Sequence, residues 1–470
     1  MSSADSHDVA IVGAGLAGLT AGARLAERGV RALVLEKGAD ERYPCNVRIS
    51  GGVFHICFRH LDDDGAALTD TIKRNTRGFA RDDQTAVTVK LSRKAVQWFK
   101  EKGARFEPGG AEAWRENTLA APAAKPGERW AGHGGGELLR ILTGVVKSGG
   151  GTVLLGARAK RLRMEGNRCV GLEADHQGKS TAVTARNVIL CDGGFQADEA
   201  LVREYIVPHP EKLRQRNSGS GGGDALRMAR EIGAQLVGMD KFYGHVLARE
   251  AMQSDMLWPY PMVDPICSAG LVVDGAGRRF ADEGLGGVWM TNCIAHLPDP
   301  LSAAAVFDDR IWSGPAASGH IYGANPYLVK AGANLVKAES LQSLAGALGL
   351  PAGALETTVA EYNRAVEAGQ TGRLDPARTA TSYKPFPIAN PPYYGLKLCA
   401  GLTFTMGGIA IDEVGRVLDR NSKAIPGLYA AGACTGGLDG GPYAGYVGGL
   451  AKSAAMGLNT ADHIAASLKA

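Results

Sequence analysis

The chain has 470 residues, a formal net charge of +4, 21% charged residues and 45% hydrophobic residues. These fractions are typical of a globular protein, and the small net charge with scattered basic residues argues against a nucleic-acid partner. No run approaches 18 uninterrupted apolar residues, so we expect no membrane-spanning helix, and the length predicts two domains.

Glycine and cysteine usage narrow the class further. The 65 glycines are about twice the average share of roughly 7%, and their clusters favour close approach of the backbone to a ligand. The eight cysteines show no CxxC and no paired spacing, which favours reduced thiols and gives no sign of a metal site. With no basic and apolar leader at the start, we expect a cytoplasmic protein.

The first predicted element is a strand over residues 9–12 that runs into the turn Gly13-Ala-Gly15-Leu-Ala-Gly18. A helix over 19–28 and a second apolar strand over 30–35 complete a strand–turn–helix–strand unit. In such a unit the first Gly allows a tight turn, the second lets a pyrophosphate approach the backbone, and the third lets helix and strand pack closely. The phosphates lie at the helix N-terminus, where N–H groups and the dipole favour an anion.

Glu36 ends the second strand, 18 residues after Gly18. An acid near this position bonds ribose hydroxyls, and an acid in place of Arg argues against a 2′-phosphate, so the ligand is FAD or NAD. The alternative is a Gly-rich turn that binds nothing. The predicted contacts of this unit are Gly13, Ala14, Gly15, Leu16, Ala17, Gly18, Glu36 and Lys37.

The remaining elements follow from apolar periodicity and from turn residues. In the first half we expect helices over 70–103, 137–146 and 224–233, strands over 152–155 and 187–192, and an antiparallel meander over 162–174. In the second half we expect a strand–turn–strand over 271–283, a helix over 341–366, two strands within 402–418, a strand over 425–432 and a helix over 450–466.

Two organisational predictions come from this pass. The nucleotide-binding domain comprises residues 1–235 and 371–470, split around an inserted domain of residues 236–370. Asp282 and Glu283 are expected to hold the turn at Arg278 and Arg279 through paired charges, and not to act in catalysis.

Four separated motifs match one family. They are the opening turn, Ile189-Leu-Cys-Asp-Gly-Gly-Phe195, the segment over 271–283 that contains Arg279-Phe-Ala-Asp-Glu283, and Thr405-Met-Gly-Gly408 followed by Gly427-Leu-Tyr-Ala-Ala-Gly432. Together they resemble the FAD-dependent flavoproteins of the fumarate reductase and succinate dehydrogenase superfamily, with its 3-ketosteroid Δ1-dehydrogenase and tricarballylate dehydrogenase branches. The resemblance implies an α/β fold, with a Rossmann-like FAD-binding domain split around an α+β capping domain, and hydride transfer between a substrate carbon and flavin N5.

The resemblance also implies further FAD contacts. A double glycine and a helix N-terminus face the isoalloxazine ring in this reading, and the helix start would stabilise the reduced, anionic flavin. Non-covalent FAD is favoured, because Cys45 and Asn46 stand where a flavin-linking His would be, and a Cys45 thioether is the alternative. The further contacts are Asn46, Ser50, Gly51, Gly52, Ala159, Asp192, Gly193, Asp224, Gly432, Gly448, Gly449, Leu450 and Ala451.

The substrate side departs from the fumarate reductases. Their Arg proton donor maps to Gly287, their substrate-binding His to Phe404, and their carboxylate-clamping Arg to a position near Tyr446. A dicarboxylate needs cationic partners to offset its desolvation, so these losses argue against fumarate reduction by the usual residues.

Residues 441–446 resemble instead the Tyr-containing segment of the ketosteroid dehydrogenases. Carried over, Tyr443 would donate to a substrate carbonyl beside the Val447 N–H, and so acidify the adjacent C–H. The tyrosine base of those enzymes also maps to Gly287, so the candidate bases are Tyr446, Tyr243 and His245.

The resulting prediction is an FAD-dependent dehydrogenase that desaturates a C–C bond beside a carbonyl, on a cyclic or otherwise apolar small molecule, with an external electron acceptor. One alternative is a dehydrogenase or reductase of a small carboxylic acid. Another is a flavin-bearing electron-transfer subunit of a complex, whose partner must be another chain because no haem or ferredoxin-like motif is present.

Overall fold

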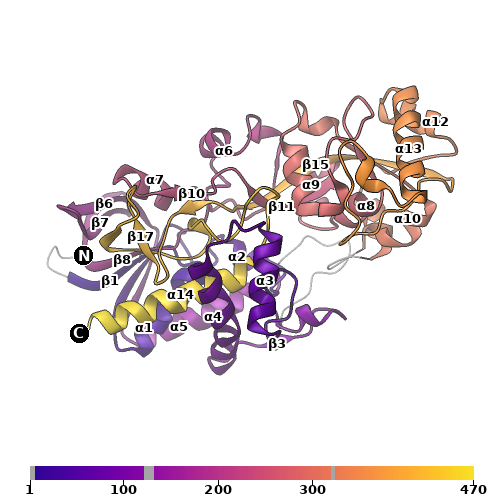
Figure 1. The fold of residues 1–470 in the computed structure, drawn as a ribbon. Coiled ribbons are helices and arrows are strands. Elements are labelled where there is room, and N and C mark those ends of the chain that lie inside the picture. Colours follow the sequence, from indigo (N-terminus) through magenta and orange to yellow (C-terminus); the bar gives the residue numbers. More distant parts are fainter. Residues whose placement is uncertain (1–5, 121–131, 319–322, 470) are drawn as a thin grey trace.

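Two β-sheets organise the chain, and the computed structural model describes residues 6–120, 132–318 and 323–469. Figure 1 shows two lobes: the first contains both termini and the eight-stranded sheet, and the second extends away from it around the six-stranded sheet. In the described residues, no helix combines the length and the hydropathy needed to cross a bilayer.

The first sheet has the order β17-β18-β8-β1-β2-β5, with β7 on β8 and β6 on β7. Strands β18, β8, β1, β2 and β5 are parallel, and β2 is buried along its whole length, as expected where both faces of a parallel sheet are covered. The bounds are β1 Ser6–Val12, β2 Ala32–Glu36, β5 Thr152–Leu155, β6 Ala157–Glu165, β7 Arg168–His176, β8 Lys179–Leu190, β17 Arg416–Leu418 and β18 Ala424–Ala430.

Helices α1, α4, α5 and α14 pack against one another below this sheet (Figure 1). The Ala-rich α14 packs against both α1 and α4, because small side chains allow close approach. The helices of this lobe are α1 Leu16–Glu27, α2 Asn46–Ile49, α3 Gly65–Asn75, α4 Asp82–Glu101, α5 Gly135–Ser148, α6 Glu199–Tyr205, α7 Asp224–Glu231 and α14 Gly449–Ser467. Short strands β3 Phe106–Glu107 and β4 Thr118–Leu119 pair beside them.

The second sheet is built on β15, which runs over Tyr393–Thr405 and pairs with β11, β13, β14 and β9. Its other strands are β9 Arg214–Gln215, β11 Phe242–Ala248, β12 Leu271–Val273, β13 Ala304–Asp308 and β14 Val336–Ala338. Strand β10 Leu236–Val237 pairs separately with β16 Gly408–Ile409. The helices are α8 Asp264–Ala269, α9 Gly287–Ala295, α10 Asp309–Ser313, α11 Ala324–Lys330, α12 Leu341–Leu348 and α13 Ala352–Glu367.

The pairing of β11 with β15 contains an irregularity that matters for the site. Tyr243 lies opposite Phe404, whereas Gly244 lies opposite Leu402. Thr403 is therefore the extra residue of a β-bulge, a feature that bends a strand and redirects a side chain. Strand β9 adds on the same stretch, so that the Arg216 N–H donates to the Leu402 carbonyl at 2.8 Å.

The predicted fold class is confirmed, with three differences in the elements. The helix expected over 70–103 is two helices, because Arg77 and Gly78 take positive φ values between α3 and α4. The helix expected over 341–366 is also two, because Gly349 ends α12 in the left-handed conformation and Pro351 precedes α13. The second strand expected within 271–283 is a single bridge, Val273 to Arg279.

The domain boundaries at 236 and 371 stay a prediction. Strand β15 lies wholly beyond residue 371, yet all of its pairing is within the second sheet. We therefore propose that the insertion extends to Thr405.

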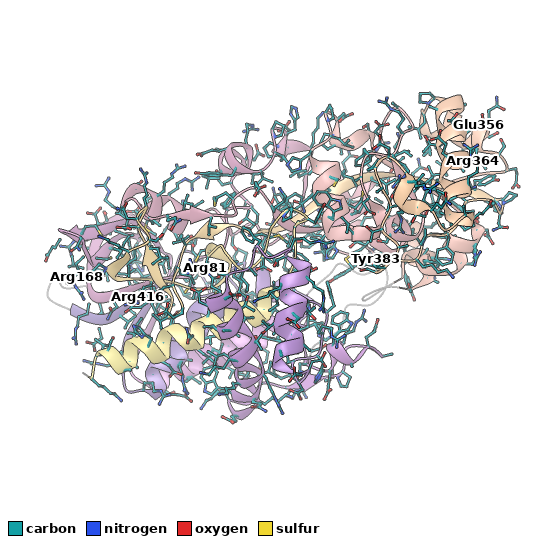
Figure 2. All side chains as sticks on the ribbon, viewed as in Figure 1. Arg81, Arg168, Glu356, Arg364, Tyr383 and Arg416 are labelled. Carbon is teal, nitrogen blue, oxygen red and sulfur yellow. The ribbon has the colours of Figure 1, made fainter. Side chains whose placement is uncertain are left out.

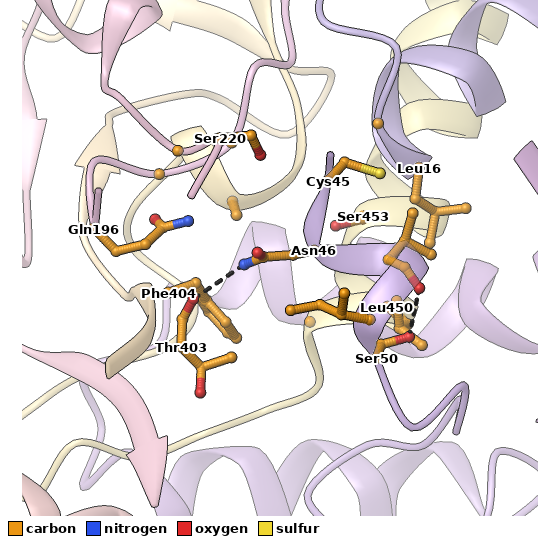
Figure 3. Close-up of a pocket in the computed structure, with 18 of the residues that line it drawn as sticks. Leu16, Cys45, Asn46, Ser50, Gln196, Ser220, Thr403, Phe404, Leu450 and Ser453 are labelled. Carbon is orange, nitrogen blue, oxygen red and sulfur yellow. Dashed lines mark hydrogen bonds between the residues drawn. The ribbon is translucent and has the colours of Figure 1, made fainter. Parts of the chain in front are cut away.

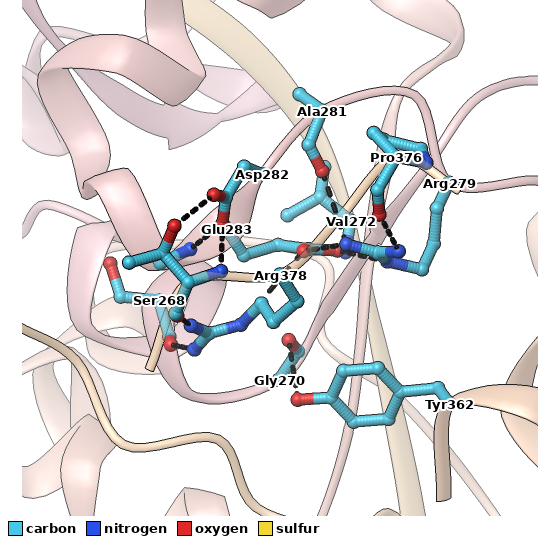
Figure 4. A network of polar contacts seen from close by, with 12 residues as sticks. Ser268, Gly270, Val272, Arg279, Ala281, Asp282, Glu283, Tyr362, Pro376 and Arg378 are labelled. Carbon is cyan, nitrogen blue, oxygen red and sulfur yellow. Dashed lines mark hydrogen bonds and ion pairs between the residues drawn. The ribbon is translucent and has the colours of Figure 1, made fainter. Parts of the chain in front are cut away.

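A buried charge cluster holds the second lobe together (Figure 4). Glu283 is fully buried and accepts from Arg279 through both oxygens, Nε to Oε1 at 3.0 Å and Nη2 to Oε2 at 2.6 Å. Arg378, also fully buried, adds a contact from Nε to Glu283 Oε2 at 3.9 Å. Asp282 accepts from the Thr379 N–H and hydroxyl instead. Glu283 thus serves the paired-charge role expected from the sequence, and Asp282 ties down a different segment.

Glu283→Gln should destabilise the protein strongly, because it leaves two buried guanidinium groups without a counter-ion. We expect a loss of about 3–5 kcal/mol in the free energy of unfolding, measured by urea denaturation. The matched control is Glu204→Gln, which breaks an exposed pair with Arg230 and should cost about 1 kcal/mol or less. Equal losses in the two variants would contradict the assignment.

Candidate functional site

A cavity of about 370 Å³ is lined by both lobes. The first lobe contributes the opening turn, the end of β2 and the start of α14, and the second contributes β11, β15 and the segment before α8. Figure 3 shows part of this wall, with Leu16, Cys45 and Ser453 on one side and Gln196, Thr403 and Phe404 on another. In Figure 2, Tyr383, which also lines the cavity, lies between the two lobes.

The three glycines of the opening turn have different surroundings. A Cβ on Gly13, whose φ is +96°, would lie 2.7 Å from Asp192 Cα, and one on Gly18 would lie 2.0 Å from the Gly13 carbonyl oxygen. A Cβ on Gly15 would meet nothing closer than 4.0 Å, because this residue opens onto the cavity. The turn therefore packs tightly on both sides and leaves room for a ligand in the middle.

Glu36 is buried at the end of β2 and is held by two backbone donors. Its Oε2 accepts from the Ala14 N–H at 2.9 Å and its Oε1 from the Gly38 N–H at 2.8 Å. Each carboxylate oxygen can accept more than one hydrogen bond, so the fixed Glu36 can still receive ligand hydroxyls.

Two buried acceptors in the cavity wall have no partner in the described structure. They are Asp192 Oδ1 and Gln196 Oε1, whereas Asp192 Oδ2 accepts from the Ala225 N–H at 2.9 Å. Burial raises the pKa of Asp192 to about 7. Two orphaned acceptors, of which Asp192 lies beside the opening turn, suit a ligand that carries several hydroxyls next to phosphate, as the ribose, ribitol and pyrophosphate of FAD do.

Most predicted FAD contacts line the cavity, and a few support it from behind. Those in the wall are Gly13, Gly15, Leu16, Ala17, Glu36, Lys37, Asn46, Ser50, Gly51, Gly52, Ala159, Asp192, Gly193, Asp224, Gly449 and Leu450. Those outside the wall are Ala14, Gly18, Gly432, Gly448 and Ala451. Of these, Ala14 donates to Glu36, and Gly448 takes a φ of +152° before α14.

Asn46 joins the two lobes at the cavity (Figure 3). Its Nδ2 donates to the Thr403 carbonyl at 3.0 Å, and its Oδ1 accepts from the Ser218 N–H and hydroxyl, each at 3.0 Å. Cys45 lies beside it in the wall, and burial raises the pKa of its thiol to about 11.

A chain of hydrogen bonds in the second lobe leads into the cavity. Tyr243 and His245 lie two residues apart on β11, so both side chains share one face of the strand. The Tyr243 hydroxyl is 2.8 Å from His245 Nε2, and His245 Nδ1 is 2.5 Å from Asp264 Oδ2. Burial lowers the pKa of His245 and the Asp264 carboxylate opposes this shift. The neutral ring therefore donates from Nδ1 to Asp264 and accepts at Nε2 from Tyr243.

Tyr446 meets this chain from the first lobe. Its ring stacks on that of Tyr243 with a centroid distance of 3.9 Å, and Phe404 lies within 5.1 Å of Tyr243. The Gly449 N–H at the start of α14 donates to the Tyr446 hydroxyl at 3.1 Å. Burial raises the pKa of Tyr446, while the Gly449 N–H and the Tyr243 side chain oppose this shift, so its hydroxyl stays protonated.

Asp264 occupies the volume that any side chain at position 287 would need. A Cβ on Gly287 would lie 1.9 Å from Asp264 Cγ. The residue that the sequence analysis found missing at Gly287 is thus replaced in space by a carboxylate from another segment.

The structure does not bring Tyr443 together with the other candidates. Its side chain is 42% exposed, lies outside the cavity wall and packs against Trp289 at a centroid distance of 5.1 Å. The Val447 N–H, expected beside a substrate carbonyl, donates to Asp439 Oδ1 at 2.7 Å. Because this donor is already bonded, that part of the expected carbonyl site is wrong.

Sequence reasoning missed three polar residues of this wall. Asp264, Arg216 and Gln196 all line the cavity. No spacing signal links Asp264 to His245, which lies 19 residues before it, and the Gly-rich stretch after Arg216 was the only nearby hint.

Gly15→Val should remove the cofactor without unfolding the chain, because the new side chain enters the cavity and meets no backbone. We expect the flavin-to-protein absorbance ratio of the purified variant to fall at least about tenfold. Gly144→Val is the control, since Gly144 has open space around it and lies outside the cavity wall. Full flavin content in Gly15→Val would contradict the placement of the cofactor.

Asp192→Asn should stabilise the apoprotein at high pH. Because the folded-state pKa of about 7 exceeds the ordinary value of about 3.9, the folded wild type loses stability as the pH rises from about 4 to about 7. Asn carries no such charge. Urea denaturation should show that the free energy of unfolding of Asp192→Asn exceeds that of wild type by about 1–4 kcal/mol at pH 8, and that this difference shrinks towards pH 5. The control is Asp175→Asn, on the exposed face of β7, whose difference in stability from wild type should not change with pH. The same pH-independent difference in Asp192→Asn would contradict a raised pKa of Asp192.

The sequence has relatives of several activities. A protein named probable fumarate reductase from Shewanella frigidimarina is 27% identical over 93% of this chain and 71% of its own length. The chain spans only 35% and 45% of two longer relatives. A 4-oxocyclohexanecarboxylate 2-dehydrogenase of Sinomonas cyclohexanicum is 24% identical over 92% of this chain and 88% of the relative.

The fold is shared with a solved structure of 3-ketosteroid-Δ4-(5α)-dehydrogenase from Rhodococcus jostii. The two superpose with a TM-score of 0.74 at 23% identity, over 99% of this chain and 98% of the other. The model of the FAD binding domain family matches residues 8–445, which is nearly the whole chain. The chain therefore belongs to the FAD binding domain family, and it is an FAD-dependent oxidoreductase.

Proposed function

We propose that this protein is a dehydrogenase that desaturates a C–C bond beside the carbonyl of a cyclic ketone. The observation that carries the proposal is the Asp264–His245–Tyr243 chain of hydrogen bonds, which ends in the cavity against Tyr446. FAD, when bound, supplies the acceptor for the hydride that leaves the β-carbon.

Tyr243 is the proposed proton acceptor for the α-carbon. A tyrosine is a poor base by itself near pH 7, since its ordinary pKa is about 10. Here the Tyr243 hydroxyl can pass its own proton to His245 Nε2 as it receives the proton of the substrate. The imidazolium formed in this way is stabilised by Asp264, which also holds the tautomer required for the transfer.

Tyr446 is the proposed donor to the substrate carbonyl. Its hydroxyl accepts from the Gly449 N–H, and the bond that it receives increases the polarity of its O–H group. A fixed donor in a water-poor site stabilises the negative charge that develops on the carbonyl oxygen. Tyr446 thus replaces Tyr443 in the role that the sequence suggested.

The walls of the cavity favour a cyclic substrate. The lining of the cavity includes rings and apolar groups, which come from Tyr243, Tyr260, Met262, Phe404 and Tyr446. The names of two relatives, the 4-oxocyclohexanecarboxylate dehydrogenase and the ketosteroid dehydrogenase, indicate that cyclic ketones are handled by related proteins.

The remaining parts of the proposal concern the cofactor and the setting. We propose that FAD is bound non-covalently, because the raised pKa of Cys45 disfavours the thiolate that a thioether link requires. The electrons leave to an external acceptor, and the eight free cysteines support a cytoplasmic location.

Anaerobic bleaching of the flavin tests the function directly. Wild-type holoenzyme is mixed with cyclohexanone, 4-oxocyclohexanecarboxylate or a 3-ketosteroid, and flavin absorbance is followed in a stopped-flow instrument. Tyr243→Phe should keep FAD and slow bleaching by about 10²–10⁴-fold, because the proton acceptor is lost. Asp264→Asn should slow the same step less.

The matched control is Tyr443→Phe, a substitution of the same kind at the exposed tyrosine. It should leave the bleaching rate within about twofold of wild type. Slow bleaching in Tyr443→Phe together with a normal rate in Tyr243→Phe would reverse the assignment, and no bleaching by any ketone would sink the proposed function.

A further inference from the structure

Arg216 is a buried cation in the wall of the cavity. It is 5% exposed and follows β9, where its N–H bonds to β15. Its side chain contacts three neutral acceptors: Nε donates to the Pro259 carbonyl at 3.1 Å, Nη1 to Thr403 Oγ1 at 3.0 Å, and Nη2 lies 3.7 Å from Met262 Sδ. The Tyr260 ring lies 5.1 Å from the guanidinium carbon.

This arginine differs from the other deeply buried cations of the chain. Arg279 and Arg378 contact Glu283, and Lys452 contacts Asp439 at 3.3 Å. In the described residues, no carboxylate oxygen lies within 4.0 Å of the Arg216 guanidinium. A buried charge without an opposite charge is costly, so proteins that keep one usually supply a ligand of opposite sign.

The guanidinium also has donors to spare. An arginine has five N–H groups, and the three contacts above leave two of them unused. The Thr403 hydroxyl accepts from Arg216 and retains its own proton for donation. The bulge at Thr403 places this hydroxyl beside the guanidinium. Two guanidinium N–H groups and one hydroxyl form a set of donors that matches a carboxylate.

We propose that Arg216 and Thr403 bind a carboxylate of the substrate, so that the natural substrate is a cyclic keto acid and not an uncharged ketone. This inference rests on the proposed function, because it adds a second anchor to the ketone held by Tyr446. A single cation suits a monocarboxylate. It is also consistent with the loss of the family's cationic residues at Gly287, Phe404 and Tyr446, which would serve a dicarboxylate.

Binding of a ligand that cannot react tests the site separately from catalysis. FAD-loaded protein is titrated with cyclohexanecarboxylate and with cyclohexanecarboxamide, which have nearly the same shape but differ in charge, and Kd is read from calorimetry and from the flavin spectrum. Wild type should bind the acid at least about tenfold more tightly than the amide. Arg216→Gln should raise the Kd of the acid at least about 30-fold and leave the Kd of the amide within about threefold of its wild-type value.

Two further variants sharpen the test. Arg214→Gln is the matched control, because Arg214 lies two residues away, pairs with Asp255 and is outside the cavity wall, and it should change neither Kd. Arg216→Lys keeps the charge but cannot form the bidentate pair of hydrogen bonds. It should therefore raise the Kd of the acid by a smaller factor than Arg216→Gln does. It also keeps the proposal testable if Arg216→Gln fails to fold or to hold FAD.

The outcomes separate this inference from the proposed function. Unchanged affinity for the acid in Arg216→Gln, or in Arg216→Lys if only that variant folds, would overturn the carboxylate site. So would an equal loss for acid and amide, which would show a role in shaping the cavity. If acid binding depends on Arg216 while no ketone bleaches the flavin of wild type, the carboxylate site stands and the proposed desaturation fails.

Discussion

The site depends on the space beside Gly287, which the Asp264 carboxylate fills because glycine has no side chain. Asp264 enters the space beside Gly287, where any Cβ would overlap its carboxyl group. From there Oδ1 accepts from the Val246 N–H at 2.8 Å and Oδ2 contacts His245. The same carboxylate therefore fixes the end of β11 and the tautomer of the histidine. A larger residue at 287 would expel it and remove the partner that fixes the tautomer of His245.

The other half of the site is held by a second carboxylate, that of the buried Asp439. Asp439 accepts from the Val447 N–H and pairs with Lys452, which lies on α14. This fixes the loop that contains Tyr446 against the start of the helix, where the Gly449 N–H reaches the tyrosine hydroxyl. The two lobes then meet through the stacked rings of Tyr243 and Tyr446. Each ring is thus positioned by an acid of its own lobe, Tyr243 by the half-buried Asp264 and Tyr446 by the buried Asp439.

The sequence predicts the parts of this structure that depend on local chemistry. The opening turn, Glu36 and the strands of the first sheet follow from glycine positions and apolar runs, and the structure has them where expected. The residues that divide two of the expected helices, Gly78, Gly349 and Pro351, are also local signals in the sequence. The breaks were not predicted because the apolar periodicity continues on both sides of them.

What could not be predicted depends on contacts between distant segments. Tyr443 and Tyr446 are three residues apart in one Gly-rich loop, and nothing in their sequence shows that one is exposed and the other stacks on Tyr243. Asp264 and Arg216 become site residues only through the packing of α8 against β11 and of β9 on β15. The resemblance identified the position that lost its catalytic residue, but only the fold shows what replaced it.

The distribution of charge explains how such a site can work beside an anionic substrate. The rings of Phe404 and His245 border the stacked tyrosines, and the positive charge of Arg216 acts on the pKa of both Tyr243 and His245. Among the described residues of the cavity wall, Arg216 is the cation that has no carboxylate within 4.0 Å, and it lies by the Thr403 bulge. In the proposed transfer, His245 receives the proton of Tyr243 and becomes an imidazolium beside the Asp264 carboxylate. The His245–Asp264 pair then has no net charge. In the proposed site, Arg216 and Thr403 would stabilise the carboxylate of the substrate, whereas Tyr446 would stabilise the charge that develops on the ketone oxygen.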